Sequence, residues 1–286
     1  MEAVEVLATF GAPAAVGLFI GVLSGLLGIG GGTIMVPVFR LGFGLSPLLS
    51  TATSLFTIIP TSISGAVSHL KGKTCVPSLG LAMGLGGAVT SPIGVWLASL
   101  SPSWLVMLGA ALCIGYSAVN MLGKAIKVSP KPSKQDGVAN GAEGGEAPEA
   151  ADPAAPAAPK LTRKQLVIGA CIGLGAGLAS GYVGLGGGFI MVPLMLSFVG
   201  IPMKLASGTS LIAVLLLAIP GTVENGLAGN IDYVVGLSVA VGSIPGAIIG
   251  ARLVSMVPER ALRFVFGGFL IVAAVVLFLN EFGILG

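Results

Sequence analysis

The stretch GIGGGTIMVP at residues 28–37 recurs as GLGGGFIMVP at residues 184–193. The same spacing holds without a gap beyond the motif, since Thr53-Ser54-Leu55 falls on Thr209-Ser210-Leu211. Chance does not keep one register over so long a span. The chain is therefore an internal duplication, in which each residue of the second copy lies 156 positions after its match (28 to 184).

Each copy contains four apolar blocks, and the glycine motif lies inside the first of them. The blocks cover Ala12–Phe43, Pro47–Leu70, Val76–Leu100 and Trp104–Ile126, then Leu166–Val199, Leu205–Leu227, Val234–Val257 and Ala261–Leu279. The first block of each copy is longer than the roughly 20 residues that one crossing needs. We therefore predict a helix, a break at the glycines and a second, shorter helix.

The composition indicates a membrane environment. Only 9% of the residues are charged and 55% are hydrophobic, whereas a soluble domain has roughly 25% charged residues. Segments that cross a bilayer must satisfy their own backbone hydrogen bonds, and these runs do not alternate as barrel strands do. The sequence predicts an all-α integral membrane protein with about four to five membrane helices in each repeat.

The segment between the copies has a different composition. Residues 128–159 are rich in Ala, Pro, Gly and Glu. Such a segment cannot bury a core, which predicts a disordered linker. The predicted organisation is an N-terminal membrane repeat (1–127), the linker (128–159) and a C-terminal membrane repeat (160–286).

The basic residues discriminate between parallel and inverted repeats, because Lys and Arg concentrate on the cytoplasmic side of a membrane protein. With the linker inside, inverted repeats leave only Arg40 of the 14 basic residues outside, whereas parallel repeats would also place Lys204, Arg252, Arg260 and Arg263 there. We therefore predict inverted repeats, a cytoplasmic linker and both termini in the periplasm.

Glycine-rich breaks at matched positions of two repeats point to a transporter's binding site. Glycine lets the backbone leave the helix, and the freed N–H groups and helix N-termini favour an anion. The alternative is that the glycines only allow close helix packing, which three consecutive glycines disfavour. We predict substrate binding by Gly30, Gly31, Gly32, Gly186, Gly187 and Gly188, with the helices broken at Gly28, Pro37, Gly184 and Pro193.

Polar residues within the apolar blocks are further candidates. Matched hydroxyls would donate to a bound anion or bond to their own helix; they are Thr53, Ser54, Thr209 and Ser210. Arg252 would either attract the anion or extend to the membrane surface. His69 and Glu224 are candidates for proton coupling, and the simpler alternative places both at the membrane interface.

No motif indicates a cofactor, a metal site or nucleic-acid binding. The net charge is +3, and the single histidine and three cysteines show no metal-binding spacing. The chain also shows no ATP-binding loop and no cluster of catalytic side chains. We predict a secondary transporter with a small anionic substrate and membrane lipids as partners, and leave a homodimer open. The alternatives are a membrane enzyme acting on a lipid-linked substrate and a passive anion channel.

The paired motifs in a duplicated apolar chain resemble the TauE/SafE family of sulfite exporters, also called the toluene sulfonate uptake permease family. The resemblance covers nearly all of the chain except the linker, whose length departs from the family pattern. It implies a carrier in the bacterial inner membrane for sulfur-containing anions such as sulfite, sulfoacetate, other organosulfonates or thiosulfate-like ions. Carried onto this sequence, the motif positions are Gly28, Gly30, Gly31, Gly32 and Pro37, with Gly184, Gly186, Gly187, Gly188 and Pro193.

Overall fold

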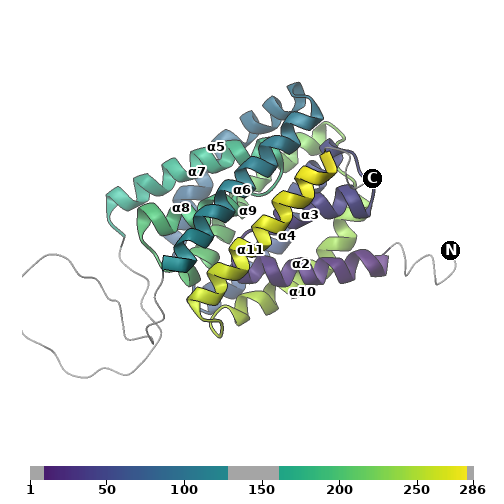
Figure 1. Cartoon of the computed structure of the whole chain (residues 1–286). Helices are drawn as coiled ribbons and strands as arrows, with labels where there is room; N and C mark the ends of the chain where they lie inside the picture. The colour runs from purple at the N-terminus through teal and green to yellow at the C-terminus, as the bar shows by residue number, and fades with distance from the viewer. Residues whose placement is uncertain (1–9, 128–160, 282–286) are drawn as a thin grey trace, which may run out of the picture.

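The computed structural model describes residues 10–127 and 161–281, and within these ranges the chain forms helices and no strand (Figure 1). The predicted all-α fold is confirmed, and the predicted linker lies outside the described residues. The helices are α2 (Ala12–Leu27), α3 (Gly32–Pro37), η2 (Val38–Gly42), α4 (Pro47–Lys71), α5 (Pro77–Leu100), α6 (Ser103–Lys127), α7 (Arg163–Val183), α8 (Gly188–Leu194), η3 (Met195–Val199), α9 (Met203–Leu227), α10 (Tyr233–Leu253) and α11 (Glu259–Glu281).

The helix bounds follow the internal duplication. Helices α4 and α9 begin at Pro47 and Met203 and end at Lys71 and Leu227, so both bounds differ by the 156 positions of the repeat. The starts of α5 and α10, and those of α6 and α11, differ by the same number. Equivalent segments of the two copies therefore form equivalent helices.

Contacts between helices give their relative directions. Thr57 and Thr61 of α4 contact Gly236 and Ser243 of α10, so these two helices run parallel. A second set of close approaches, Gly17 to Val239, Gly21 to Ser243 and Gly25 to Ala247, makes α2 parallel to α10 as well. Helices α2 and α4 therefore point the same way. The segment of α3 and η2 must return between them, so the first apolar block turns back.

The equivalent helices α4 and α9 lie against each other at the centre of the molecule and run antiparallel. Gly65 of α4 approaches Leu211 near the start of α9, whereas Gly221 near the end of α9 approaches Leu55. Helices α2 and α10 flank this pair on one side, α5 and α7 flank it on the other, and α6 packs on α11 (Figure 1).

Small residues allow the flanking helices to contact through their backbones. A Cβ atom added to Gly17, Gly21 or Gly25 of α2 would lie 2.1–2.3 Å from a carbonyl oxygen of α10. The matched glycines of α7, Gly173, Gly177 and Gly181, meet α5 in the same way. Close helix packing through glycine is therefore present in this protein, at these positions as well as at Gly28 and Gly184 of the motif.

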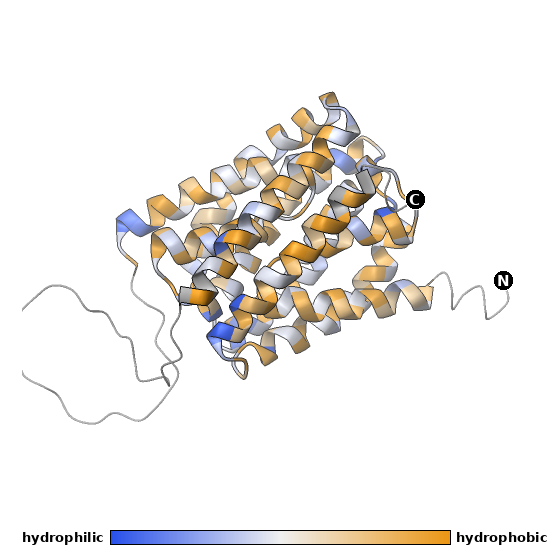
Figure 2. Ribbon diagram, viewed as in Figure 1, coloured by the Kyte–Doolittle hydropathy of each residue, from blue (hydrophilic) through white to orange (hydrophobic). Residues whose placement is uncertain are grey.

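The outer surface suits a lipid environment. Within the described residues, five helices (α5, α6, α7, α9 and α10) are long and apolar enough to cross a membrane. Many large apolar side chains are exposed on these helices, and the most hydrophilic residues gather at the helix ends (Figure 2). Helix α4 is less apolar than its match α9 because it contains many Ser and Thr residues. Most of these side chains are buried, and α4 packs against α9 and α10.

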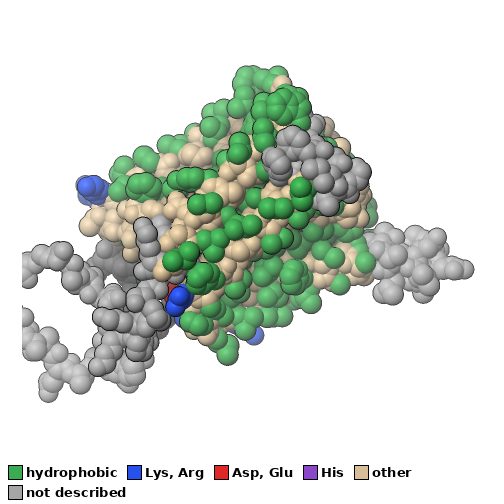
Figure 3. All heavy atoms as spheres, in the orientation of Figure 1, with side chains coloured by type: hydrophobic (Ala, Val, Ile, Leu, Met, Phe, Trp, Pro, Cys, Tyr) green, Lys and Arg blue, Asp and Glu red, His purple; other side chains and the backbone are tan. Residues whose placement is uncertain are grey.

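The two ends of the molecule differ in charge. The start of α2 and the end of α11 lie at one end, here called the terminus end. The end of α6 and the start of α7 lie at the other, here called the linker end (Figure 1). Lys and Arg side chains are visible toward the linker end in Figure 3, and the apolar surface lies between the two ends.

Candidate functional site

One break interrupts the first helical segment of each repeat. Helix α2 ends at Leu27 and α3 begins at Gly32, while α7 ends at Val183 and α8 begins at Gly188. The breaks rely on left-handed backbone conformations, with φ between 70° and 87°, at Gly28, Gly30, Gly31, Gly184, Gly186 and Gly187. Only glycine adopts these angles without steric cost, which explains why the motif contains glycine at these positions.

The two breaks cross at the centre of the molecule. A Cβ atom added to Gly32 would lie 2.5 Å from the carbonyl oxygen of Leu185 in the other break. A Cβ atom added to Gly188 would lie 2.6 Å from the carbonyl oxygen of Gly28. The predicted substrate-binding glycines from distant parts of the sequence are thus in direct backbone contact.

Two matched apolar side chains fill the space between the breaks. Ile58 of α4 and Val214 of α9 are equivalent residues, and both are completely buried. A Cβ atom added to Gly30 would lie 2.6 Å from Val214 and 3.4 Å from Ile58, and one added to Gly186 would lie 2.9 Å from Ile58 and 3.4 Å from Val214. Both residues are near the middle of 25-residue helices. The crossing therefore lies about halfway between the two ends of the molecule.

Four backbone N–H groups at the crossing lack an acceptor. Gly30 and Gly31 are buried, and no other described residue accepts a hydrogen bond from their N–H groups. The same holds for Gly186 and Gly187, although Gly188 donates to the carbonyl of Gly186 over 2.9 Å. A buried polar group without a partner costs about 1–3 kcal/mol. The centre of the molecule thus holds hydrogen-bond donors available to a ligand.

Ser24 and Ser180 are a pair that the sequence interpretation missed. Both side chains are completely buried, and neither hydroxyl has a partner among the described residues. Ser24 accepts from Gly28 N–H through its carbonyl oxygen, and Ser180 lies against Gly187. They are identical residues at matched positions of the repeat, which is the signal that would have identified them. Further buried hydroxyls without a hydrogen-bond partner among the described residues include those of Thr33, Ser54 and Ser62.

The predicted threonines have structural partners. Thr53 Oγ1 accepts a hydrogen bond from Asp232 N–H over 3.0 Å, and Thr209 Oγ1 accepts one from Val76 N–H over 2.9 Å. Asp232 and Val76 are equivalent residues that precede α10 and α5. Each threonine therefore fixes the start of a helix that belongs to the other repeat.

The predicted serines differ from each other. Ser210 Oγ lies 2.6 Å from the carbonyl oxygen of Gly28, to which it donates, and so holds the first break in place. Its match Ser54 is buried, and its hydroxyl has no hydrogen-bond partner among the described residues. The structure therefore brings Ser210 to the break, whereas Ser54 keeps a free hydroxyl.

The motif prolines stand at transitions in helix geometry. Pro37 is the last residue of α3, and Pro193 is the penultimate residue of α8. Each helix continues as a π-helical turn, η2 or η3, rather than stopping. Helices α3 and α8 have only 6 and 7 residues. Helices this short have only a small dipole, so the site depends on the individual backbone N–H groups.

The ionisable candidates lie away from the crossing. Arg252 is exposed in the last turn of α10, at the linker end. His69 is buried near the end of α4, where Nε2 lies 2.8 Å from the carbonyl oxygen of Gly25 and Nδ1 lies 2.7 Å from Thr74 Oγ1. Glu224 is half-buried near the end of α9, and its Oε2 has no described partner. The structure does not bring these three side chains together.

Comparisons with known proteins agree with this architecture. The family model described as sulfite exporter TauE/SafE matches residues 14–277. The probable membrane transporter protein YunE of Bacillus subtilis is 29% identical over 246 residues, which are 83% of this chain and 84% of that protein. A probable membrane transporter protein of Haemophilus influenzae is 29% identical over 292 residues, 93% of this chain and 96% of its own length. No solved structure matches. The chain is a multi-pass membrane protein that belongs to the TauE/SafE sulfite exporter family.

Proposed function

We propose that this protein is a secondary transporter of small sulfur-containing anions, such as sulfite, sulfoacetate or other organosulfonates, in the bacterial inner membrane. The observation that carries the proposal is the set of unpartnered donors at the crossing of the two breaks. The N–H groups of Gly30, Gly31, Gly186 and Gly187 have no acceptor among the described residues. The side chains of Ser62 and Ser180, whose hydroxyls also lack a partner there, lie beside Gly30 and Gly187. Membership in the sulfite exporter family supports the substrate class.

The chemistry of these donors suits an oxyanion. Sulfite and sulfonate groups carry three oxygens that accept hydrogen bonds, and the crossing supplies donors without acceptors. A full positive charge at this depth would be expensive in a membrane, whereas neutral N–H and O–H groups avoid that cost. A hydrogen bond to a charged group contributes roughly 1.5–3 kcal/mol. A few of these donors together account for specific binding.

In this proposal, the transporter works by alternating access, in which two inverted repeats expose the site first to one side of the membrane and then to the other. Support comes from α4 and α9, which are equivalent in sequence and antiparallel in space. The excess of basic residues at the linker end supports a cytoplasmic linker and periplasmic termini. Opposite orientations of two similar repeats let one fold open alternately toward either side of the membrane.

His69 and Glu224 remain the candidates for proton coupling. They lie near opposite ends of the molecule, since α4 and α9 run antiparallel. A neutral His69 that donates to Gly25 accepts a hydrogen bond from Thr74 at its other nitrogen. A protonated ring would have to donate to Thr74 instead. Proton uptake would therefore reverse the hydrogen bond between His69 and Thr74, in the loop after α4, while Nε2 still donates to Gly25 O of α2.

The matched serines provide the test of the binding site. Binding of sulfite, sulfoacetate, thiosulfate and sulfate to the purified protein would be measured for the wild type, Ser24→Ala and Ser180→Ala. We expect sulfite or a sulfonate to bind, and each variant to bind about tenfold to a hundredfold more weakly through the loss of one donor. Ser238→Ala is the matched control, because this buried hydroxyl donates to Val234 O of its own helix.

Two results would contradict the proposal. One is the absence of binding by every anion of the panel to the folded wild-type protein. The other is wild-type affinity in both serine variants, which would remove the crossing as the binding site. Counterflow of labelled sulfite in proteoliposomes at a clamped membrane potential then separates a carrier from a passive anion channel, since unlabelled anion inside accelerates the entry of label through a carrier and not through a channel.

A further inference from the structure

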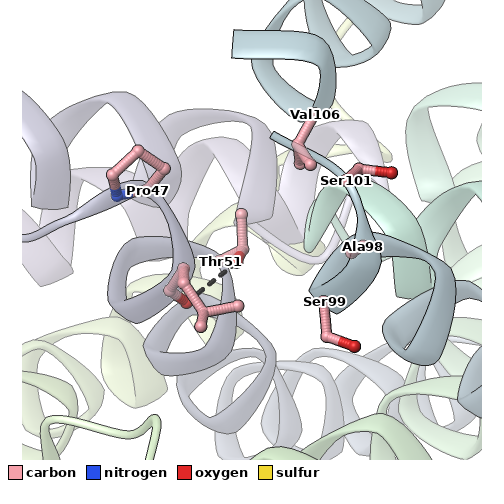
Figure 4. Close-up of a pocket in the computed structure, with 7 residues that line it drawn as sticks. Pro47, Thr51, Ala98, Ser99, Ser101 and Val106 are labelled. Atoms are coloured by element: carbon pink, nitrogen blue, oxygen red, sulfur yellow. Dashed lines mark hydrogen bonds between the residues drawn. The ribbon is translucent and has the colours of Figure 1, made fainter. Parts of the chain in front are cut away.

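A cavity of about 180 Å³ opens at the terminus end of the molecule. Its walls come from the start of α4, the end of α5 and the beginning of α6 (Figure 4). Thr51, Ser99 and Ser101 contribute hydroxyl groups, and the remaining lining residues are Pro47, Leu48, Ala98 and Val106. All three hydroxyls donate to backbone carbonyls of nearby residues, and none of the seven lining side chains is ionisable.

The inner wall of the cavity touches the second glycine break. A Cβ atom added to Gly184, the first residue after α7, would lie 2.4 Å from Thr51 Cβ. Gly184 leads directly into Gly186 and Gly187, whose N–H groups lack acceptors. The side chain of Thr51, which is 8% exposed, thus lies between the cavity and the first residue of the second break.

At the linker end, two of the residues matched to the cavity lining are more deeply buried. The repeat pairs the seven lining residues with Met203, Lys204, Ser207, Val254, Ser255, Val257 and Leu262. Met203 and Val254 are completely buried, whereas their matches Pro47 and Ala98 are half-buried; Leu262 and its match Val106 are both buried. The two halves of the molecule therefore differ here, although their sequences and helices correspond.

Polar contacts join the helices at the linker end. Lys204 Nζ donates to the carbonyl oxygen of Ser255 over 3.0 Å, which ties the start of α9 to the end of α10. Met203 N–H donates to Glu259 Oε1 over 3.1 Å, which ties the start of α9 to α11. Glu259 is also paired with Arg263 at 2.6 Å. Three helices are thereby joined at one place.

The sequence explains why these hydrogen bonds form at the linker end and not at the terminus end. Pro47 replaces Met203 at the terminus end, and proline has no N–H group to donate. Leu48 replaces Lys204 and has no amine to reach the carbonyl of Ser99. The contacts that join the helices at the linker end therefore cannot form around the cavity.

We propose that the cavity is the vestibule through which the substrate anion reaches the second glycine break, and that Lys204 and Glu259 form the latch that closes the opposite path. This inference rests on the proposed function. The structure is then the state open toward the terminus end. Opening toward the linker end requires the second repeat to adopt the arrangement of the first, which breaks the Lys204–Ser255 and Met203–Glu259 hydrogen bonds.

Cysteine accessibility tests the vestibule and the latch. Thr51→Cys and Ser207→Cys occupy matched positions on the two paths. They would be made separately in a background in which Cys75, Cys113 and Cys171 are replaced by serine or alanine. The purified protein is treated with a small sulfonate-bearing methanethiosulfonate reagent, which resembles the proposed substrate. We expect Thr51→Cys to react at least tenfold faster than Ser207→Cys.

The latch is tested by adding Lys204→Met or Glu259→Ala to Ser207→Cys. Each should raise the reaction rate of the cysteine about fivefold or more, while Lys204→Arg, which still donates to Ser255, should not. Lys164→Met removes an exposed charge at the linker end and is the control for charge alone. Equal rates at the two cysteines, or no change in either latch variant, would overturn the inference. The reaction needs no bound substrate, so failure of sulfite binding would count against the proposed substrate alone.

Discussion

The crossing of the two glycine breaks makes a sharp prediction for Gly32→Ala and Gly188→Ala. The new Cβ atom of Gly32→Ala would lie 2.5 Å from Leu185 O and 2.6 Å from Leu185 C, and that of Gly188→Ala would lie 2.6 Å from Gly28 O. Both neighbours are backbone atoms, so relief requires one break to shift against the other. Gly32 and Gly188 have ordinary negative φ angles, and the cost is therefore steric and not conformational.

The magnitude follows from overpacking in a dense core, which costs about 1–3 kcal/mol. This corresponds to a decrease of roughly 5-fold to 150-fold in the folding equilibrium. The readouts are the unfolding midpoint of the purified protein in detergent and the affinity for sulfite. Both should fall together, since the strain lies where the anion is proposed to bind.

Gly175→Ala and Gly115→Ala are the controls, because nothing lies within 4 Å of a Cβ atom at either position. Alanine is the better helix former by about 1 kcal/mol, so these variants should be as stable as the wild type or more so. Wild-type stability of both Gly32→Ala and Gly188→Ala would refute the crossing. A loss as large in the controls would show that the detergent assay does not report on this contact.

Four further predictions follow. Thr53→Val and Thr209→Val should each lower stability by about 1 kcal/mol in thermal unfolding, because each removes an acceptor that fixes a helix start in the other repeat. Burial raises the pKa of the Cys75 thiol from 9.0 to about 11. The contribution of this thiol to the free energy of unfolding is therefore complete below pH 9 and is lost as the pH rises toward 11, because the thiol ionises first in the unfolded chain. Unfolding measured against pH should show this loss in the wild type and not in Cys75→Ala. Compartment-specific reporters should place the linker in the cytoplasm and the C-terminus outside, and a cytoplasmic C-terminus would contradict inverted repeats. Deletion within Ala139–Ala158 should leave the melting temperature and sulfite binding nearly unchanged, and a large drop would show that the linker packs on the helices.

The positions of the helices were predictable because the hydropathy pattern and the internal repeat both indicate the same segments. The second apolar block, Pro47–Leu70, differs from α4 by one residue. Proline at the first helical position and apolar length together define this helix. The break inside the first block was predictable for a similar reason, since consecutive glycines cannot form a stable helix interior.

The role of each hydroxyl was less accessible to sequence reasoning. Thr53 and Ser54 are adjacent and chemically similar, yet Thr53 accepts from Asp232 N–H and Ser54 has no described partner. The difference arises from helix α10 of the other repeat, more than a hundred residues away. Ser24 and Ser180, by contrast, could have been found, because matched polar residues in apolar helices need a common reason to be retained.

The apolar residues at the crossing and the unpartnered donors around it suggest how binding and movement are coupled in the proposed transporter. Ile58 and Val214 occupy the space between the breaks, so an anion reaches the N–H groups only when α4 and α9 shift relative to them. Donors that stay buried without partners are costly, and an anion that satisfies them removes this cost. The anion therefore stabilises an arrangement in which the breaks have separated around it. Since each break is attached to a different repeat, that separation moves the repeats relative to each other and acts on the contacts of Lys204 and Glu259 at the linker end.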